Sequence, residues 1–325
     1  MSFGVGTAVK GRSWMALPLA AGALALGYAA QGLTTKSNQP FQGDVLEALI
    51  EAPAPPSDTL AAAEQLKAFQ AQRSGSALSE PAQGRAVDLE VRVALLGAGG
   101  SPTVSATAPW RLVSPQGDLL QSGTGGQTVN LTAVGRSRGE GRAAEAWLLS
   151  REGSIQVNGV AYAGRLFVVE EAGQLTLVNH LPLETYVASV VGSEMPSSWS
   201  MEALRAQAVA ARSYALAHMA RPANRHWHLG DNTRWQAYQG LQTSTARTRQ
   251  AVASTAGLIL SYQGAIVVSL YAATREISLE AHGQLGASMS QHGAQELAEQ
   301  GRRYNEILGH YYQGASLARL RSGAS

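Results

Sequence analysis

The stretch LETYVASVVGSEMPSSWSMEALRAQAVAARSYA, residues 183–215, decides the fold of this chain. Apolar side chains recur at helical spacing from Leu183 onward, which predicts a helix that begins just after Pro182. Gly192 is typical of a helix end, and Pro196 would prevent the helix from continuing. The Ser-Glu-Met-Pro run is therefore expected at the C-terminal end of this helix.

A second helix is expected directly afterwards, from Met201 to about Ala220. Ser200 is a typical N-cap, and Glu202 lies in the first turn, where a negative charge is favourable. The helix is rich in alanine. Because these side chains are small, a neighbouring element can approach the backbone closely, so the sequence predicts a central, tightly packed helix.

Upstream of these helices, residues 86–180 change to the period of two that is typical of strands. Val87–Val93 alternates strictly between apolar and polar residues. Asn158-Gly159 and Ala172-Gly173 separate later apolar runs and are typical of hairpin turns. We expect a small β domain here, whose further strands are Trp110–Val113, Ile155–Val157, Arg165–Val169 and Leu175–Val178.

The N-terminus has the pattern of a targeting segment. Lys10 and Arg12 precede an uncharged apolar run from Trp14 to Ala30, which fits an export signal. As a helix this run would be about 26 Å long, which is marginal against a bilayer core of about 30 Å. A cleaved signal peptide and an uncleaved membrane anchor both stay open for residues 1–30, and a buried core helix is the third interpretation.

Residues 31–85 are expected to be a flexible linker, because they combine the run Ala52-Pro53-Ala54-Pro55-Pro56 with a mixture of Ser, Gly, Ala and Gln. The predicted fold class is α+β. A small β domain precedes a mixed α/β core built around the Ala-rich central helix, and both follow the apolar N-terminal helix and the linker. The expected domains are 1–30, 31–85, 86–180, 181–318 and a tail at 319–325.

Composition excludes several classes of function. The 325 residues are 45% hydrophobic, enough for a sizeable core, and the length suggests about two domains. The absence of cysteine excludes a disulfide scaffold, a thiol nucleophile and thiolate-bound zinc or iron–sulfur clusters. The formal net charge is +2 and no dense Lys/Arg run occurs, so nucleic acid is not an expected partner.

Several ordered blocks stand out in the C-terminal part of the chain. They are Leu183–Val187 with Ser193-Glu194-Met195-Pro196, then Ala206–Ala215, then Asp231–Gly240 in the pattern D-x-T-x-x-Q-x-Y-x-G, and finally Ser288–Ala294. Together, over roughly residues 165–318, they resemble the SpoIID/LytB family, which includes stage II sporulation protein D and amidase-enhancer proteins. Any one block alone would be weak, but their combination is specific.

The resemblance implies peptidoglycan chemistry outside the cytoplasmic membrane, in the periplasm or cell envelope. Active members of the family are lytic transglycosylases that cleave the MurNAc–GlcNAc bond of glycan strands lacking stem peptides, and other members stimulate an N-acetylmuramoyl-L-alanine amidase. In the active members the catalytic acid is the Glu of the Ser-Glu-Met-Pro motif, which corresponds to Glu194. Glycan strands are the expected partner, a cell-wall amidase is a second one, and no cofactor is expected.

The residues themselves also point to Glu194. Cleavage of a glycosidic bond needs a proton on the leaving oxygen, and hence a carboxyl that stays protonated near neutral pH. A Glu at a helix C-terminus meets the negative end of the helix dipole, and Met195 and Trp199 would add desolvation; both effects raise the pKa of a carboxyl. A transglycosylase closes the sugar on itself, so one Glu could serve as acid and then as base. The alternative is a solvated Glu just past a helix end.

Further residues are candidates for binding the substrate. Gln207 and Arg212 lie on the second helix, where a surface salt bridge is the alternative role for the arginine. Asp231, Gln236 and Tyr238 either bind sugar or anchor a loop. The remaining candidates belong to the last block or lie just before it: His282, Ser290 and Gln291.

The chain departs from the family in one region. Many members carry a cysteine-containing block and a long insertion where Tyr271–Thr274 here passes almost directly to Glu280–Gly283. Because some members bind zinc through such Cys and His residues, no metal site is expected here, and His226 and His228 have the pattern of loop residues. Three functions stay open: an enzyme that uses Glu194, a non-catalytic activator of an amidase, and a membrane-tethered scaffold.

Overall fold

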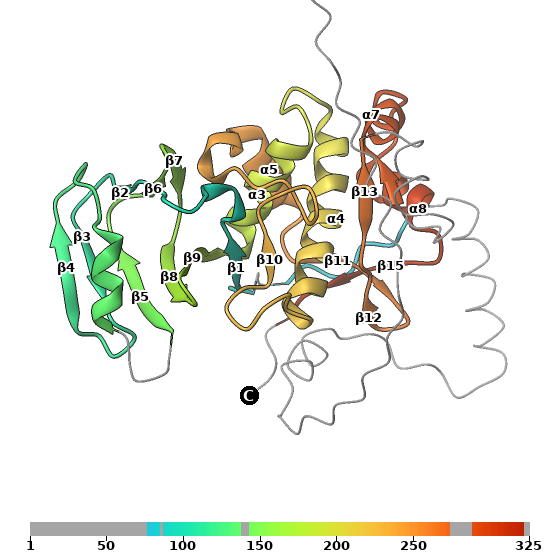
Figure 1. Cartoon of the computed structure of the whole chain (residues 1–325). Helices are drawn as coiled ribbons and strands as arrows, with labels where there is room; N and C mark the ends of the chain where they lie inside the picture. Colours follow the sequence, from blue (N-terminus) through green and yellow to red (C-terminus); the bar gives the residue numbers. More distant parts are fainter. Residues whose placement is uncertain (1–76, 85–86, 138–142, 274–287, 322–325) are drawn as a thin grey trace, which may run out of the picture. The chain divides into compact units, whose positions relative to one another are not determined.

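The computed structural model describes residues 77–84, 87–137, 143–273 and 288–321. The predicted signal or anchor at residues 1–30 and most of the predicted linker lie outside them. Among the described residues, no helix combines the length and the apolar character that crossing a bilayer requires. The mixed α+β class predicted for the rest of the chain is confirmed (Figure 1).

Seven strands form the largest sheet (Figure 1). Their order across the sheet is β10 (Leu229–Gly230), β1 (Glu90–Ala94), β9 (Gln174–Pro182), β8 (Arg165–Glu171), β5 (Ala144–Leu149), β3 (Trp110–Val113) and β4 (Leu119–Gly123). All neighbours are antiparallel except β10 and β1. Because β10 follows the two long helices in the chain, this sheet combines the strand-rich region with the helical one.

The described residues also form three smaller sheets. One has the order β2 (Val104–Ala106), β6 (Ile155–Val157), β7 (Val160–Tyr162), and the second the order β12 (Ala265–Ile266), β11 (Leu258–Tyr262), β15 (Ser316–Arg319). The third pairs β13 (Leu270–Ala272) in parallel with β14 (Ser288–Ser290). This last pair joins two separate stretches of chain just before a helix that contributes to the candidate site.

Both predicted hairpin turns are confirmed. Asn158 and Gly159 join β6 to β7 with φ angles of 50° and 82°, and Ala172 and Gly173 join β8 to β9 with φ angles of 51° and 76°. Positive φ at both central residues is typical of the type I′ turn, whose twist matches that of the flanking strands. The alternating run at 87–93 forms β1, which begins at Glu90.

The helices of the described residues include the two that the sequence predicts. They are α3 (Leu183–Glu194), α4 (Met201–Ala220), α5 (Ala246–Ser254), α7 (Gln291–Glu299) and α8 (Tyr304–Tyr311), with short 3₁₀ helices η1 (Leu96–Ala98), η2 (Leu131–Ser137) and η3 (Gly240–Thr243). Helix α4 has its predicted bounds. The Ser200 side chain caps it by accepting a hydrogen bond from the Glu202 N–H, as predicted.

Contrary to the prediction, Gly192 does not end α3, which continues to Glu194 with Met195 as an extended C-cap. The glycine has a different reason. A Cβ at this position would overlap the carbonyl oxygen of Thr243 in η3. The missing side chain lets η3 pack directly on the last turn of α3, where the Ser193 and Thr243 hydroxyls lie 2.9 Å apart.

Helix α4 is central, as its alanine content predicts. It contacts helices α3, α5, α7 and α8 and strand β11 (Figure 1). A single hydrophobic core includes residues of the large sheet and of these helices, so the predicted division at residue 180 does not separate two cores. The fully buried alanines of α4 are Ala203, Ala206, Ala208, Ala210, Ala211 and Ala215.

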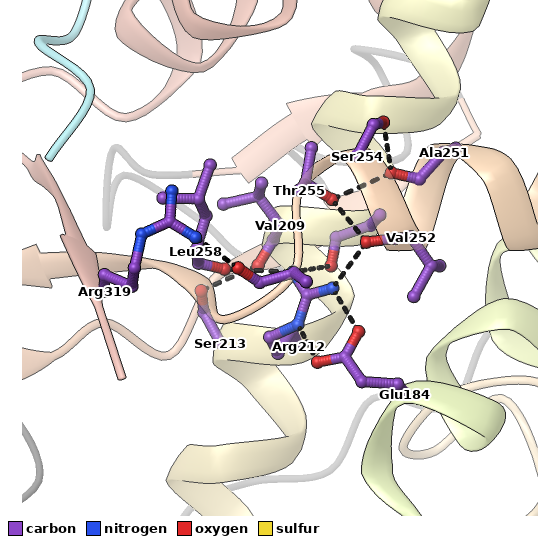
Figure 2. A network of polar contacts seen from close by, with 12 residues as sticks. Glu184, Val209, Arg212, Ser213, Ala251, Val252, Ser254, Thr255, Leu258 and Arg319 are labelled. Carbon is purple, nitrogen blue, oxygen red and sulfur yellow. Dashed lines mark hydrogen bonds and ion pairs between the residues drawn. The ribbon is translucent and has the colours of Figure 1, made fainter. Parts of the chain in front are cut away.

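A buried arginine connects α4 to three other elements (Figure 2). Arg212 is fully buried, and its Nε and Nη2 donate to the two carboxylate oxygens of Glu184 on α3 at 2.8 and 2.6 Å. Its Nη1 donates to the carbonyl of Leu258 on β11 at 3.0 Å, and Nη2 also donates to the carbonyl of Val252 on α5 at 3.4 Å. The ion pair therefore fixes α3 against α4, and the hydrogen bonds to the two carbonyls fix α5 and β11 there as well.

The residues that precede the strand-rich region pack on the C-terminal elements, although the sequence predicts a flexible linker there. Leu78 is buried, and its N–H donates to the Asn305 carbonyl at 3.1 Å. The Asn305 amide donates back to the Leu78 carbonyl at 3.0 Å, and Arg319 Nε donates to the Ala82 carbonyl at 2.9 Å. These contacts attach residues 77–84 to α8 and β15.

We predict that Arg212→Met lowers the free energy of unfolding by about 3 kcal/mol, because it breaks a largely buried ion pair and leaves buried carbonyls without donors. Urea denaturation followed by circular dichroism measures this change. Arg302→Met is the matched control, since the Arg302–Glu306 pair is largely exposed and should contribute less than about 1 kcal/mol. Equal losses for the two variants would contradict the structural role of Arg212.

Gly192→Ala is predicted to lower the free energy of unfolding by about 2 kcal/mol, because the new methyl group meets backbone that cannot rotate away. The matched control is Gly100→Ala, where an added Cβ finds open space and the change should be within about 0.5 kcal/mol. Thermal unfolding of both variants measures the difference. A wild-type melting temperature for Gly192→Ala would show that η3 does not pack on α3 as described.

Candidate active site

Glu194 lies at the C-terminal end of α3, where the chain turns sharply away from the helix. Met195 is extended, with φ −131° and ψ 141°, and its side chain is buried. Pro196 cannot continue the helix. The Glu194 side chain is half-buried and stands where the last carbonyls of α3 concentrate the negative end of the helix dipole.

Two donors from distant parts of the chain hold the Glu194 carboxylate. The backbone N–H of Ala237 donates to Oε1 at 2.9 Å, and the side-chain amide of Gln291 donates to Oε2 at 3.1 Å. Each oxygen therefore has one protein donor, and the carboxyl group has a defined orientation.

The pKa of Glu194 is raised above the ordinary value of a glutamate, chiefly because burial penalises the charged form. The hydrogen bonds from Ala237 and Gln291 act in the opposite direction, because they stabilise the carboxylate, but burial dominates. The direction agrees with the sequence prediction, and buried Met195 supplies part of the apolar surroundings that the prediction invoked.

Gln236 fixes the backbone N–H that contacts Glu194. Its side chain is fully buried. It accepts a hydrogen bond from the Tyr186 hydroxyl at 2.9 Å and donates to the Ala211 carbonyl at 3.1 Å and to the Tyr271 hydroxyl oxygen at 2.7 Å. The amide thus binds α3, α4 and β13 at once, and the next residue along the chain, Ala237, presents its N–H to the carboxylate.

Asp231 and Tyr238 anchor the same loop to η1 and to the large sheet. The Asp231 carboxylate accepts hydrogen bonds from the N–H groups of Leu96 at 3.1 Å and Gly97 at 3.4 Å. The Tyr238 hydroxyl, which is buried, donates to the side-chain oxygen of Asn179 at 2.7 Å. The sequence left two roles open for these residues, binding of sugar and anchoring of a loop. In the structure both side chains make contacts that anchor the loop.

Comparison with known proteins finds matches over the part of the chain that contains Glu194. Residues 171–262 match the family model described as stage II sporulation protein, SpoIID. This chain carries a SpoIID-family segment. The resemblance predicted from the sequence is confirmed, and the matched residues include Glu194 and the 231–240 loop.

Curated relatives share the SpoIID segment with this chain. The amidase enhancer of Bacillus subtilis is 34% identical over 99 residues, which are 30% of this chain and 13% of that protein. Stage II sporulation protein D of the same organism is 37% identical over 100 residues, which are 26% of this chain and 29% of that protein. An uncharacterized protein of Brachyspira hyodysenteriae is 34% identical over 130 residues, 40% of this chain and 35% of that protein. The chain thus spans about a third or less of the length of these relatives.

The second donor to Glu194 lies beyond the matched SpoIID segment, at the start of α7. Ser290 caps this helix by accepting a hydrogen bond from the Gly293 N–H at 3.1 Å. The His292 N–H donates to the Ala273 carbonyl at 3.1 Å, next to the β13–β14 pair. These contacts fix the first turn of α7 and so hold Gln291 beside the Glu194 carboxylate. The sequence predicted only a contact between Gln291 and the substrate.

The loop that follows Glu194 in the SpoIID segment is held by two residues that the sequence does not single out. The Arg247 guanidinium donates to the carbonyls of Ser197 and Trp199, both at 2.7 Å. The Gln295 side chain accepts a hydrogen bond from the Ser200 N–H at 2.8 Å. All three bonds go to backbone groups, which leave no pattern in a sequence, so only the tertiary structure identifies them.

The remaining predicted residues of the site fall in different places. Arg212 belongs to the buried ion pair described above. Gln207 is fully buried, and neither its amide nitrogen nor its amide oxygen has a hydrogen-bond partner among the residues that the structure describes. His282 lies outside the described residues. His226 contacts Phe167 through its ring, in keeping with a loop residue.

The described part of the chain contains no group of three or more His, Asp or Glu side chains placed to hold a metal ion. Among the described residues, the group of this site best suited to proton transfer is the Glu194 carboxyl. It is half-buried, has two fixed donors, and carries a raised pKa.

The raised pKa of Glu194 predicts a pH-dependent difference in stability between the wild type and Glu194→Gln. A carboxyl whose pKa is raised by folding stabilises the protein fully below its unfolded pKa, about 4.3, and that contribution is lost as pH rises through the folded pKa. The glutamine does not titrate, so the melting temperature of the variant relative to wild type should rise as the pH increases above about 4.3. Glu296→Gln, at an exposed side chain, gives the baseline, and a falling difference would contradict the raised pKa.

Proposed function

We propose that this protein is an exported lytic transglycosylase that cleaves the MurNAc–GlcNAc bond of peptidoglycan strands lacking stem peptides, with Glu194 as general acid and base. Residues 171–262 match the SpoIID family model, and stage II sporulation protein D of B. subtilis is similar to part of this chain; both matches support a role in cell-wall remodelling. The observation that carries the finer assignment is the single half-buried carboxyl with a raised pKa and two fixed donors. Such a carboxyl is suited to proton transfer near neutral pH.

The reaction needs one carboxyl and no added water. Protonated Glu194 gives its proton to the oxygen that links C1 of MurNAc to the next sugar, and the C1–O bond breaks. The carboxylate so formed takes the proton of the C6 hydroxyl of the same MurNAc as that oxygen bonds to C1. The products are a 1,6-anhydro end and a free hydroxyl on the departing sugar, and Glu194 returns to its protonated form.

The two donors to Glu194 suit the second half of this cycle. Ala237 N–H and the Gln291 amide both stabilise the charged carboxylate, which exists only after the first proton transfer. Burial favours the protonated form before that transfer. Each effect thus favours one of the two forms, which suits a group that serves first as acid and then as base.

The place of action is part of the same proposal. The apolar run at residues 14–30, preceded by Lys10 and Arg12, supports export to the periplasm or cell envelope. If the segment is not cleaved, it would tether the enzyme to the cytoplasmic membrane. Peptidoglycan strands are then the substrate within reach.

A second candidate function is the activation of a cell-wall amidase without catalysis. The observation in its favour is the 34% identity to the B. subtilis protein named amidase enhancer. In this case the SpoIID segment would bind an N-acetylmuramoyl-L-alanine amidase, and Glu194 would not take part in bond cleavage.

Peptide-free glycan strands incubated with wild type and with Glu194→Gln distinguish these functions. Mass spectrometry of the products should show 1,6-anhydro-MurNAc ends with the wild type and a loss of at least about 100-fold with the variant. The wild-type rate should fall as pH rises above the pKa of Glu194, because the acid form is depleted. Glu296→Gln, an exposed carboxyl on α7, should retain full activity.

Two other results would contradict the transglycosylase. Reducing ends in place of anhydro ends would mean hydrolysis, which requires a second group to activate water. Intact strands with folded wild-type protein, together with stimulation of a purified amidase by both wild type and Glu194→Gln, would establish the activator instead.

A further inference from the structure

Three tyrosines lie within the electrostatic reach of Glu194. Its negative charge contributes to raising the pKa of Tyr186 on α3, Tyr214 on α4 and Tyr271 on β13, in each case after the larger effect of burial. The rings of Tyr214 and Tyr271 are in edge contact, with centroids 6.4 Å apart. These phenols, which come from three elements, therefore lie near the carboxyl group.

The hydroxyls of two of these tyrosines are already engaged in the protein. Tyr186 donates to the Gln236 side-chain oxygen at 2.9 Å, and the Tyr271 oxygen accepts from the Gln236 nitrogen at 2.7 Å. Both belong to the network that fixes the Ala237 N–H on Glu194. Substitution of either would disturb the site itself.

The Tyr214 hydroxyl is different, because it makes no hydrogen bond to any residue that the structure describes. The residue as a whole is 8% exposed, and its ring packs against His218 with centroids 4.5 Å apart. Some buried side-chain oxygens and nitrogens of this protein have no hydrogen-bond partner among the described residues. The Tyr214 oxygen is not among these buried atoms. The ring therefore packs within the protein, while the hydroxyl is not fully enclosed.

The chemistry of this hydroxyl is that of a donor. Burial and the charge of Glu194 raise the pKa of Tyr214 to about 12, so the O–H stays protonated throughout the working range. The best partner for such a donor is a neutral oxygen that carries no hydrogen, because that oxygen can only accept a hydrogen bond. On an N-acetylated glycan the strongest neutral acceptor of this kind is the carbonyl oxygen of the acetamido group.

We propose that Tyr214 is a substrate-binding residue whose O–H donates to the acetamido carbonyl of the sugar beside the bond that Glu194 protonates. The assignment rests on the proposed function, and it names the group of the glycan that the site recognises. It makes the enzyme selective for N-acetylated over de-N-acetylated strands. The fixed ring supports this role, because a donor that is already oriented loses little entropy when the ligand binds.

Tyr214→Phe tests the proposal, because it keeps the ring and removes only the hydroxyl. On peptide-free N-acetylated strands we expect kcat/KM to fall about tenfold, the effect of one neutral hydrogen bond. On chemically de-N-acetylated strands the variant and wild type should be equal, since the acceptor is gone. Tyr262→Phe, at an exposed tyrosine of the β11–β12 hairpin, is the matched control and should change neither rate.

The comparison of the two substrates separates recognition from a structural effect. A purely structural role for Tyr214 would lower activity on both substrates by the same factor, and this would overturn the proposal. Unchanged activity of Tyr214→Phe on the acetylated strands would overturn it as well. Circular dichroism melting curves of Tyr214→Phe and Tyr262→Phe, recorded in parallel, should agree with wild type.

A binding measurement separates this proposal from the proposed function. Glu194→Gln is titrated by calorimetry with N-acetylated peptide-free strands, alone and combined with Tyr214→Phe. A dissociation constant about ten times higher for the double variant supports Tyr214 even if the wild type cleaves nothing, in which case only the transglycosylase assignment fails. Equal dissociation constants, or no binding by Glu194→Gln, overturn the role of Tyr214.

Discussion

The ion pair between Arg212 and Glu184 is the interaction on which the arrangement of the helices depends. The guanidinium is fully buried and donates to Glu184 on α3 and to backbone carbonyls of α5 and β11. An arginine stays charged in a protein, and an unpaired buried charge costs several kcal/mol, so alternative packings that leave it without acceptors are disfavoured. The Ala-rich surface of α4 permits the close approach that these contacts need. Together they determine where α3 lies, and hence where its last residue, Glu194, is presented.

Hydrogen bonds from remote segments then complete the surroundings of Glu194. The amide of Gln236 binds α3, α4 and β13 from within the core and so fixes the adjacent Ala237 N–H. Asp231 and Tyr238 attach the same loop to η1 and to β9 of the large sheet. The strand-rich region thus has a structural part in the site without contributing a reacting group. This explains why no chemical motif is recognisable in its sequence.

The site combines two opposing electrostatic effects on one carboxyl. Burial raises the pKa of Glu194, while its two donors favour the charged form. Burial alone would favour the protonated form of the carboxyl, and the donors alone would favour its charged form. The balance between them is the physical basis for the proposed acid and base roles. Both donors are held by well-fixed elements. A mobile donor would make the pKa of Glu194 variable.

The sequence by itself determined the local structure and singled out the candidate reacting group. Helical spacing, the Ser200 cap and the hairpin turns follow short-range rules, so α3, α4 and the turns after β6 and β8 were predictable, as was Glu194 near a helix end. Only the tertiary structure decided which groups surround Glu194, because its two hydrogen-bond donors lie 43 and 97 residues away along the chain. The same holds for Arg212 and Gln236, whose polar side chains suggest a surface role but are fully buried in the core. Hydrogen bonds to backbone groups and contacts across long separations depend on how the helices pack, and no spacing in the chain encodes that packing.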